Sequence, residues 1–534
     1  MATRRLFANR LPQFFSLTQD VAPMPVDQKR VRVSPGWERW LDCGRRLVWA
    51  GVASVVGVAA AVTGESVARA ELRVGAAEVE ITPPVGFPMA GYYHERLATG
   101  AKDPLKAKAL VFRDGETRAA VVACDLTGIA TDLTAEVRER IARATGIPGE
   151  AVTVCGTHSH TAPDYGRDLY EHVSELRGGT PPAQPRYTAT LIEAIAKAVI
   201  DADRAAVPAV LSRAEAIQET PVSFNRRFVM RDGTVKTWQS HANPEVVRAA
   251  GPIDPAVGVV VARPAAGGTP LATFTNFALH LDTVGGLEWS ADYPYFIEQS
   301  VRGALGNGVV SVFGLGCCGD INHSNPRSTV RNKTDFIGKA LGATVVGALP
   351  KVQPVKNPRL RSFSETVLLP LQAPSVAEVQ AARGLLTAVQ GGQNAEFFAQ
   401  VTAYKQVMID QLREKQPTEA PGRWLKWGLT HRLAGVGDAL PVEVRVIALA
   451  DDLALVFLPG EVFVELGLAI RQGSPFDQTL VVELSNAVET IYIPNRGAYA
   501  QGGYEVTNSA LQPGGGEMLV EAALRLLAKA AQQR

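Results

Sequence analysis

The chain is poor in cysteine, with five in 534 residues. Cys43 lies close to the N-terminus, so Cys124, Cys155, Cys317 and Cys318 remain for the body of the protein. Four thiols at these spacings do not form a disulfide framework. They leave room for one bridge in an exported protein, although the sequence does not give its pairing. For Cys124 and Cys155 we expect buried thiols at strand ends.

The sequence also lacks an excess of either charge. Lys and Arg number 54 against 53 Asp and Glu, and no block of like charge interrupts the body of the chain. Nothing in this balance suggests the basic groove of a nucleic-acid-binding protein, and we expect no nucleic-acid partner. No Gly-x-Ser-x-Gly motif occurs beyond the N-terminal region, which argues against a serine hydrolase with a nucleophile elbow. The composition is that of a globular protein with a sizeable core.

A sustained apolar run occurs near the N-terminus. Arg45 and Arg46 precede the run at residues 47–62, and an Ala-x-Ala signal follows at residues 68–70. This order is typical of an export signal, so we expect a mature protein that begins near Glu71 and works in the periplasm or outside the cell. Because the run is shorter than the ~20 residues of a membrane span, we favour cleavage. An uncleaved anchor at residues 47–62 is the alternative.

Strand and helix patterns alternate after the N-terminal extension of residues 1–70. Asp114-Gly115 and Asp451-Asp452 are turns of predicted hairpins. We predict an α/β fold, with a mixed β-sheet core and flanking helices in a single large catalytic domain at residues 71–534. The predicted strands are 74–82, 107–112, 118–124, 151–155, 257–262, 271–278, 309–315, 442–450 and 453–458. The predicted helices are 134–145, 187–203, 295–305, 375–414 with a break at Gly391-Gly392, and 517–531.

Histidines follow two of the predicted strands. His158 and His160 lie two residues apart after strand 151–155, and His280 follows strand 271–278. If the first strand stays extended through the pair, both imidazoles leave on one face and form half of a zinc site. Such histidines are also common as solvated or hydrogen-bonded structural residues. Glu461, after a strand and a Pro-Gly turn, would complete a His2Glu set with an open position.

Several segments together resemble the neutral/alkaline ceramidase family. Residues 156–163 read Gly-Thr-His-Ser-His-Thr-Ala-Pro, residues 74–83 read Val-Gly-Ala-Ala-Glu-Val-Glu-Ile-Thr-Pro, and residues 458–461 read Leu-Pro-Gly-Glu. Asn225-Arg226, Gly319-Asp320 and the aromatic residues of the final loop also match. The matches run in order across residues 72–527.

The resemblance implies a zinc enzyme that hydrolyses the N-acyl amide bond of ceramide or a related N-acyl lipid, with contact to a membrane surface. Zinc with an open position acidifies a bound water to a pKa of about 7 and polarises the amide carbonyl. The resemblance leaves open whether Tyr504 or His160 returns a proton to the leaving amine. The implied Zn2+ ligands are His158, His280, Glu461 and Tyr492, and the implied catalytic residues are His160, Arg226, Tyr499 and Tyr504, with Arg227 as a rival for Arg226.

The sequence departs from the family pattern at three places. His280 is followed by Leu-Asp-Thr-Val-Gly-Gly, and Cys317-Cys318 replaces polar residues before Gly319. The chain also ends soon after helix 517–531, without the C-terminal β-sandwich domain of full-length ceramidases. These departures affect the expectation of ceramide as substrate more than that of zinc-dependent hydrolysis.

Other classes fit less well. A metallo-β-lactamase-like hydrolase would need His-x-His-x-Asp-His, but residues 162 and 163 are Ala and Pro. An amidohydrolase barrel would need further histidines and an Asp at strand ends. A catalytically silent envelope protein that binds lipid or glycan is the alternative outside enzymes, and retention of all four candidate ligands argues against it. The sequence leaves the oligomeric state open.

Overall fold

A nine-stranded mixed sheet forms the centre of the described part of the chain. The structure is a computed structural model that describes residues 71–178, 184–328, 330–414 and 431–533, so the predicted export signal lies outside it. All of these residues fall within one unit, Ala68–Arg534. In spatial order the strands are β14 (Val310–Leu315), β12 (Ala272–Phe277), β11 (Ala256–Pro264), β6 (Val207–Ile217), β1 (Arg73–Glu80), β3 (Lys106–Asp114), β4 (Thr117–Cys124) and β5 (Val152–Gly156), with β16 (Gln353–Pro354) beside β6.

A second sheet of four strands packs face to face against the first. Its order is β17 (Arg361–Pro370), β18 (Ala439–Ala448), β19 (Leu453–Phe457) and β21 (Gln478–Val482). Phe112, Val121 and Phe274 of the large sheet share one buried cluster with Leu455 and Phe457 of the smaller sheet. The β-sheet core is therefore two layers thick.

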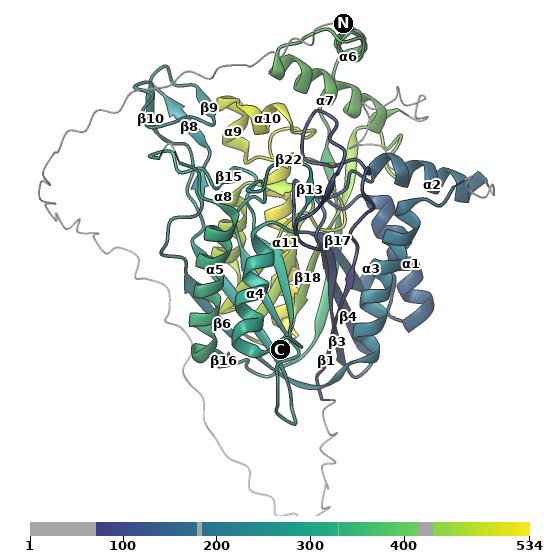
Figure 1. Cartoon of the computed structure of the whole chain (residues 1–534), viewed down its shortest axis with the longest axis vertical. Helices are drawn as coiled ribbons and strands as arrows, with labels where there is room; N and C mark the ends of the chain where they lie inside the picture. Colours follow the sequence, from purple (N-terminus) through teal and green to yellow (C-terminus); the bar gives the residue numbers. More distant parts are fainter. Residues whose placement is uncertain (1–70, 179–183, 329, 415–430, 534) are drawn as a thin grey trace, which may run out of the picture. The chain divides into compact units, whose positions relative to one another are not determined.

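Helices cover the outer faces of both sheets (Figure 1). The large sheet is covered by α1 (Thr131–Thr145), α3 (Tyr187–Arg204), α4 (Tyr293–Leu305) and α5 (Thr334–Ala348), and the smaller sheet by α8 (Val464–Gly473) and α11 (Gly515–Gln532). The predicted α/β class with a mixed sheet and flanking helices is confirmed.

The apolar strands are explained by this layering. In β4, Val121 faces the second sheet while its neighbour Val122 packs in the cluster formed with the helices. A strand buried on both faces gains from apolar residues at every position, so its sequence reads as a continuous hydrophobic run. The β3–β4 hairpin is antiparallel, whereas β4–β5, β12–β14 and β19–β21 are parallel.

Parallel pairing places several loops at carboxyl ends of strands, where open α/β sheets bind ligands. Four short strands bridge these loops in pairs: β20 (Glu461–Val462) with β22 (Tyr492–Ile493), and β7 (Phe224–Asn225) with β15 (Ile321–Asn322). The other short strands are β2 (Gly100–Ala101), β13 (Glu288–Trp289), β8 (Arg227–Met230), β9 (Val235–Thr237) and β10 (Val246–Ala249). The short helices of the same unit are η1 (Gly149–Ala151), η2 (Leu349–Lys351), α9 (Arg496–Gln501) and α10 (Tyr504–Thr507).

A helical hairpin adjoins these loops. Its helices are α6 (Val376–Gln390) and α7 (Phe397–Arg413), and the predicted break at Gly391-Gly392 is where α6 ends. Ser375 and Glu378 form a reciprocal capping box that fixes the start of α6. The remaining helix, α2, spans Gly166–Gly178. Within the described ranges, we find no helix with the length and apolar character needed to cross a membrane.

Candidate metal centre

His158 and His160 lie in the turn that follows β5. The strand ends at Gly156, and His158 takes a left-handed conformation with φ of 77°, so the pair is not an extended continuation of the strand. Tethering of the turn, rather than strand alternation, brings the imidazoles together. The backbone N–H of His158 donates to the carbonyl of Leu126 at 2.8 Å, and that of His160 donates to the carbonyl of Leu281 at 3.1 Å. The second bond joins the turn to the loop that carries His280.

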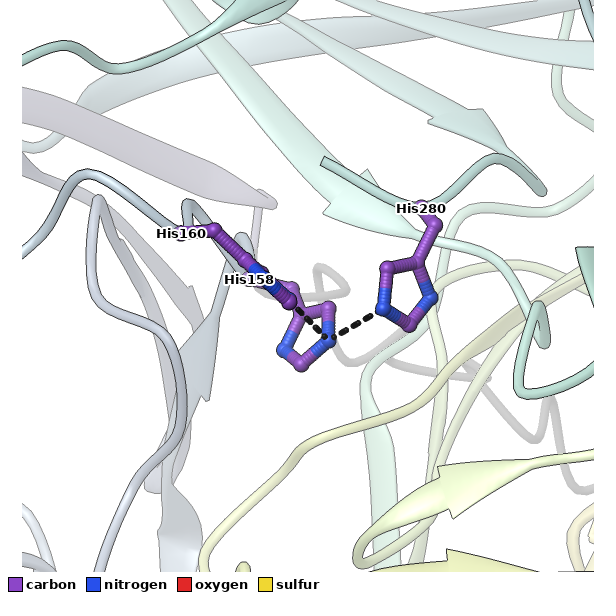
Figure 2. A group of neighbouring side chains, drawn as sticks. All are labelled: His158, His160 and His280. Atoms are coloured by element: carbon purple, nitrogen blue, oxygen red, sulfur yellow. Dashed lines mark hydrogen bonds between the residues drawn. The ribbon is translucent and has the colours of Figure 1, made fainter. Parts of the chain in front are cut away.

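The three imidazoles converge on one point (Figure 2). Nε2 of His158 lies 3.0 Å from Nε2 of His280 and 3.3 Å from Nε2 of His160. The His158 and His280 rings are perpendicular, with centroids 4.3 Å apart. Both of these side chains are buried, whereas His160 is slightly more accessible.

Glu461 brings a carboxylate to the same point. Its Oε2 lies 3.4 Å from Nε2 of His158 and 3.8 Å from Nε2 of His280. Glu461 and Tyr492 are directly paired in the short β20–β22 bridge, and the backbone N–H of Glu461 donates to the carbonyl of Ile491 at 2.8 Å. This pairing places the Tyr492 side chain beside the carboxylate, although 30 residues separate the two in sequence.

The protonation states favour a cation. Burial raises the pKa of Glu461, but the interactions with His158 and Arg226 lower it by more than burial raises it. The pKa is therefore below its usual value, and the carboxylate is ionised. Burial lowers the pKa of His160 to about 4 and that of His280 well below its usual value, so both rings are neutral at neutral pH. Metal ions require neutral imidazoles and ionised carboxylates, and these residues supply both.

The contacts around Nε2 of His158 test whether a metal fits. Nδ1 of His158 lies 2.6 Å from the carbonyl oxygen of Thr127, so Nδ1 carries the proton and Nε2 carries a lone pair. That lone pair meets Nε2 of His280, Nε2 of His160 and Oε2 of Glu461, and Oε2 has no hydrogen-bond partner among the described residues. One proton cannot satisfy three such neighbours. A cation can, and ligand atoms about 2.0–2.1 Å from a tetrahedral zinc lie roughly 3.3 Å apart, which resembles the observed spacings.

Arg226 holds the far side of Tyr492. Its Nη2 donates to the Tyr492 hydroxyl at 3.0 Å and to the carbonyl of Gly319 at 2.8 Å, while its Nε donates to Oε1 of Glu505 at 2.8 Å. Burial lowers the pKa of this guanidinium, but Tyr492 and Glu505 outweigh burial and hold the pKa above its usual value. Arg226 is therefore a buried, fully charged donor whose position Glu505 fixes. Its neighbour Arg227 instead donates to the carbonyl of Gly502 at 2.7 Å.

A cleft of about 1030 Å³ opens above the imidazoles, with His160, His280, Arg226, Tyr492 and Tyr504 among its lining residues. A smaller pocket of about 80 Å³ adjoins it and reaches His158 and Glu461. The centre is thus the floor of an open cleft.

Aromatic side chains form a connected group along this cleft. The Tyr504 ring lies 5.7 Å from that of Tyr492, 4.7 Å from that of Trp238 and 6.0 Å from that of Phe397. Trp238 is 50% exposed and Phe397 41% exposed, whereas Tyr492 is buried. The group therefore runs from solvent to the centre and offers an apolar path.

Sequence reasoning missed several residues at this site. The Tyr92 hydroxyl donates to Oδ1 of Asp282 at 2.8 Å, and the same oxygen lies 3.7 Å from Nδ1 of His160. Tyr93 and Tyr404, the latter on α7, also line the cleft. The Leu-Asp-Thr departure after His280 was the signal for Asp282, while the adjacent tyrosines lie in a loop with no periodic pattern.

Of the residues singled out from the sequence, seven gather at the centre or line the cleft, and Tyr499 lies elsewhere. Its hydroxyl is 3.0 Å from Oγ of Ser509, and it is absent from the described lining of both pockets. Cys317 and Cys318 are buried free thiols, as are Cys124 and Cys155. Cys318 donates to Oε1 of Glu483 at 3.1 Å, and Oε2 of Glu483 accepts the backbone N–H of Val462 at 2.6 Å.

Comparison with known proteins gives structural likeness without close sequence likeness. No family model and no curated protein matches the chain. The crystal structure of neutral ceramidase from Pseudomonas aeruginosa is similar, with a TM-score of 0.62 and 18% identity over 86% of this chain and 75% of that chain. A ceramidase complexed with C2 gives a TM-score of 0.61 and 18% identity over 86% of this chain and 76% of that chain. The chain therefore has the neutral ceramidase fold.

Proposed function

We propose that the chain is a zinc-dependent hydrolase that cleaves the N-acyl amide bond of a lipid-like substrate, with ceramide or a related N-acyl lipid as the substrate class. The observation that carries this proposal is the meeting of the His158, His160 and His280 nitrogens with the Glu461 carboxylate on the floor of a wide cleft. The ceramidase fold of the chain supports the same substrate class.

In this proposal His158, His280 and Glu461 hold the zinc ion, and Tyr492 completes the set. These three are mutually within 3.0, 3.4 and 3.8 Å. Bound zinc supplies Lewis-acid chemistry, since it polarises a carbonyl and acidifies a water. Thr127 fixes the His158 ring through its carbonyl, in the manner of an outer-shell partner that sets the orientation of a ligand.

The remaining cleft residues act on the amide. His160 is neutral and reaches the centre with Nε2, so it can accept a proton and return it to the leaving amine. Arg226 and Tyr504 lie around Tyr492 and can stabilise negative charge on the carbonyl oxygen. The aromatic group from Trp238 to Tyr492 receives the acyl chain and keeps water away from it.

The test is release of fatty acid from a short-chain ceramide in detergent micelles by the full-length chain, with added zinc and with a chelator. We expect release that the chelator abolishes and zinc restores. Protein that contains stoichiometric zinc but releases nothing would contradict the substrate class, and protein without zinc or activity would contradict the whole proposal and favour a silent binding protein.

The His158→Ala and Glu461→Ala variants test the ligand assignment. We expect each to retain its fold and to lose zinc and activity, with an activity loss beyond the roughly 10–100-fold cost typical of outer-shell changes. His94→Ala is the matched control, because His94 lines the same cleft but lies outside the histidine cluster. Normal turnover in either ligand variant would remove the proposed centre.

A further inference from the structure

A second group of polar side chains lines the cleft beside His160. It consists of Asp282, His323 and Arg331, and we call it the polar group. Asp282 connects this group to the centre, because its Oδ1 lies 3.7 Å from Nδ1 of His160 and accepts the Tyr92 hydroxyl at 2.8 Å. A ligand held by the polar group would therefore lie next to the residue that we propose to protonate the leaving amine.

His323 and Arg331 have unused hydrogen-bonding capacity. His323 is 4% exposed, and within the described ranges its buried Nδ1 has no hydrogen-bond partner. Leaving such a nitrogen unpaired costs free energy, so a group that forms a hydrogen bond with it would be stabilised. Arg331 is exposed and forms no ion pair with any residue that the structure describes.

The other cations of the cleft are already paired. Arg226 is bonded to Glu505, and Nε of Arg167 donates to Oε1 of Glu171 at 3.0 Å. Arg331 differs from both, because its guanidinium remains available to a ligand. Arg331 is also near His323: burial lowers the pKa of His323, Asp282 opposes this effect, and Arg331 adds a smaller lowering.

Two acids also line the cleft. They are Glu95 and Asp282. Asp282 accepts the Tyr92 hydroxyl at 2.8 Å and lies 3.7 Å from Nδ1 of His160. Asp282 is thus already engaged by Tyr92 and His160, whereas Arg331 forms no ion pair within the described ranges.

We infer that Arg331 and His323 bind an acidic group, a carboxylate or a phosphate, on the amine portion of the substrate. Arginine suits this role because its planar guanidinium donates two parallel hydrogen bonds to such groups. The inference rests on the proposed function and deepens it: the favoured substrates are N-acyl lipids whose leaving amine carries an anion. The acyl portion has a separate place, because the aromatic group of the cleft is apolar and lies around Tyr504.

Three substrates with one acyl chain test the inference on the full-length, zinc-loaded protein. N-lauroylethanolamine is neutral, N-lauroylglycine carries a carboxylate, and N-lauroylphosphoethanolamine carries a phosphate. We expect kcat/KM to be at least tenfold higher for one or both anionic substrates than for the neutral one. The comparison between the two anionic substrates identifies which acid is preferred.

Arg331→Gln should remove this preference and leave hydrolysis of the neutral substrate unchanged. Arg167→Gln is the matched control, because Arg167 lines the same cleft but is paired with Glu171, and it should keep the preference. Equal kcat/KM for all three substrates in the unmodified protein, or an unchanged preference in Arg331→Gln, would overturn the inference.

Binding separates this inference from the proposed function. If no substrate is hydrolysed, calorimetry with N-lauroylglycine and N-lauroylethanolamine still measures headgroup recognition. Tighter binding of the glycine compound that Arg331→Gln abolishes would support the inference and reject the hydrolase. Equal binding of the two compounds would overturn the inference, and hydrolysis of ceramide alone would do so while retaining the proposed function.

Discussion

Replacement of Glu505 by Gln should destabilise the protein, because this carboxylate compensates buried positive charge. Glu505 is fully buried, and its Oε1 accepts a hydrogen bond from Nε of Arg226 at 2.8 Å. Its Oε2 accepts a hydrogen bond from the Thr237 hydroxyl at 2.9 Å and lies 3.4 Å from Nε of Arg227. Both arginine side chains are 4% exposed. Removing one partner of a buried ion pair costs about 3–5 kcal/mol, since the other charge stays buried without compensation.

The expected change in melting temperature follows from this free energy. Unfolding entropy near 60 °C is about 2.1 cal/mol/K per residue, so a unit of roughly 460 residues has about 1 kcal/mol/K. A loss of about 3–5 kcal/mol then lowers the melting temperature by about 3–5 °C. Circular dichroism during heating measures this shift.

Glu365→Gln provides the control for Glu505→Gln. Glu365 pairs with Arg525 at 2.7 Å, but the two side chains are 36% and 56% exposed. Such surface pairs contribute about 0–1 kcal/mol, so the control should shift the melting temperature by no more than about 1 °C. A shift in Glu505→Gln no larger than that of the control would refute the argument that Glu505 compensates Arg226.

Two further predictions concern the turn at His160 and a buried acid. Gly91→Ala should lower kcat by about 100-fold with zinc content unchanged, because a Cβ at Gly91 would lie 2.7 Å from Cβ and Cγ of His160. Gly86→Ala is the control for backbone strain, since Gly86 also has a positive φ but no atom lies near its added Cβ. Glu489 accepts hydrogen bonds from Thr131, and burial raises its pKa from 4.5 to about 7. The folded state therefore binds its proton more tightly, so its contribution to stability is present below pH 4.5 and is lost as pH rises through 7. Glu489→Gln should flatten the fall in stability over that range, measured by urea denaturation at several pH values, and an unchanged slope would contradict the assignment.

The sequence predicts the class of fold because strands buried on two faces carry strong signals. The β3–β4 hairpin and the apolar β14 are predicted clearly, since most residues in them are buried. The division of strands into two facing sheets does not follow from such runs. Within residues 119–124 of β4, adjacent side chains face different layers, yet all are small and apolar, so the sequence does not distinguish the partners.

The candidate centre is partly predictable for a related reason. His158, His280 and Glu461 follow strands, and loops at carboxyl ends of parallel strands meet at one edge. Asp282 is visible only as a departure from the family pattern after His280, and Glu505 in α10 gives no comparable signal, because acidic side chains are usually exposed. Their roles depend on contacts across more than 100 residues of sequence, with His160 and Arg226 respectively.

The centre is supplied by both sheets. His158 and His280 follow strands of the large sheet, while Glu461 and Tyr492 form the bridge that follows β19 and β21 of the smaller one. An ion bound by these residues would link the two sheets. A ligand that binds only the folded state and is present at 100 times its Kd raises the free energy of unfolding by about 2.7 kcal/mol. Removal of the metal should therefore loosen the structure as well as abolish activity, and amide hydrogen exchange should become faster at the strand ends of both sheets.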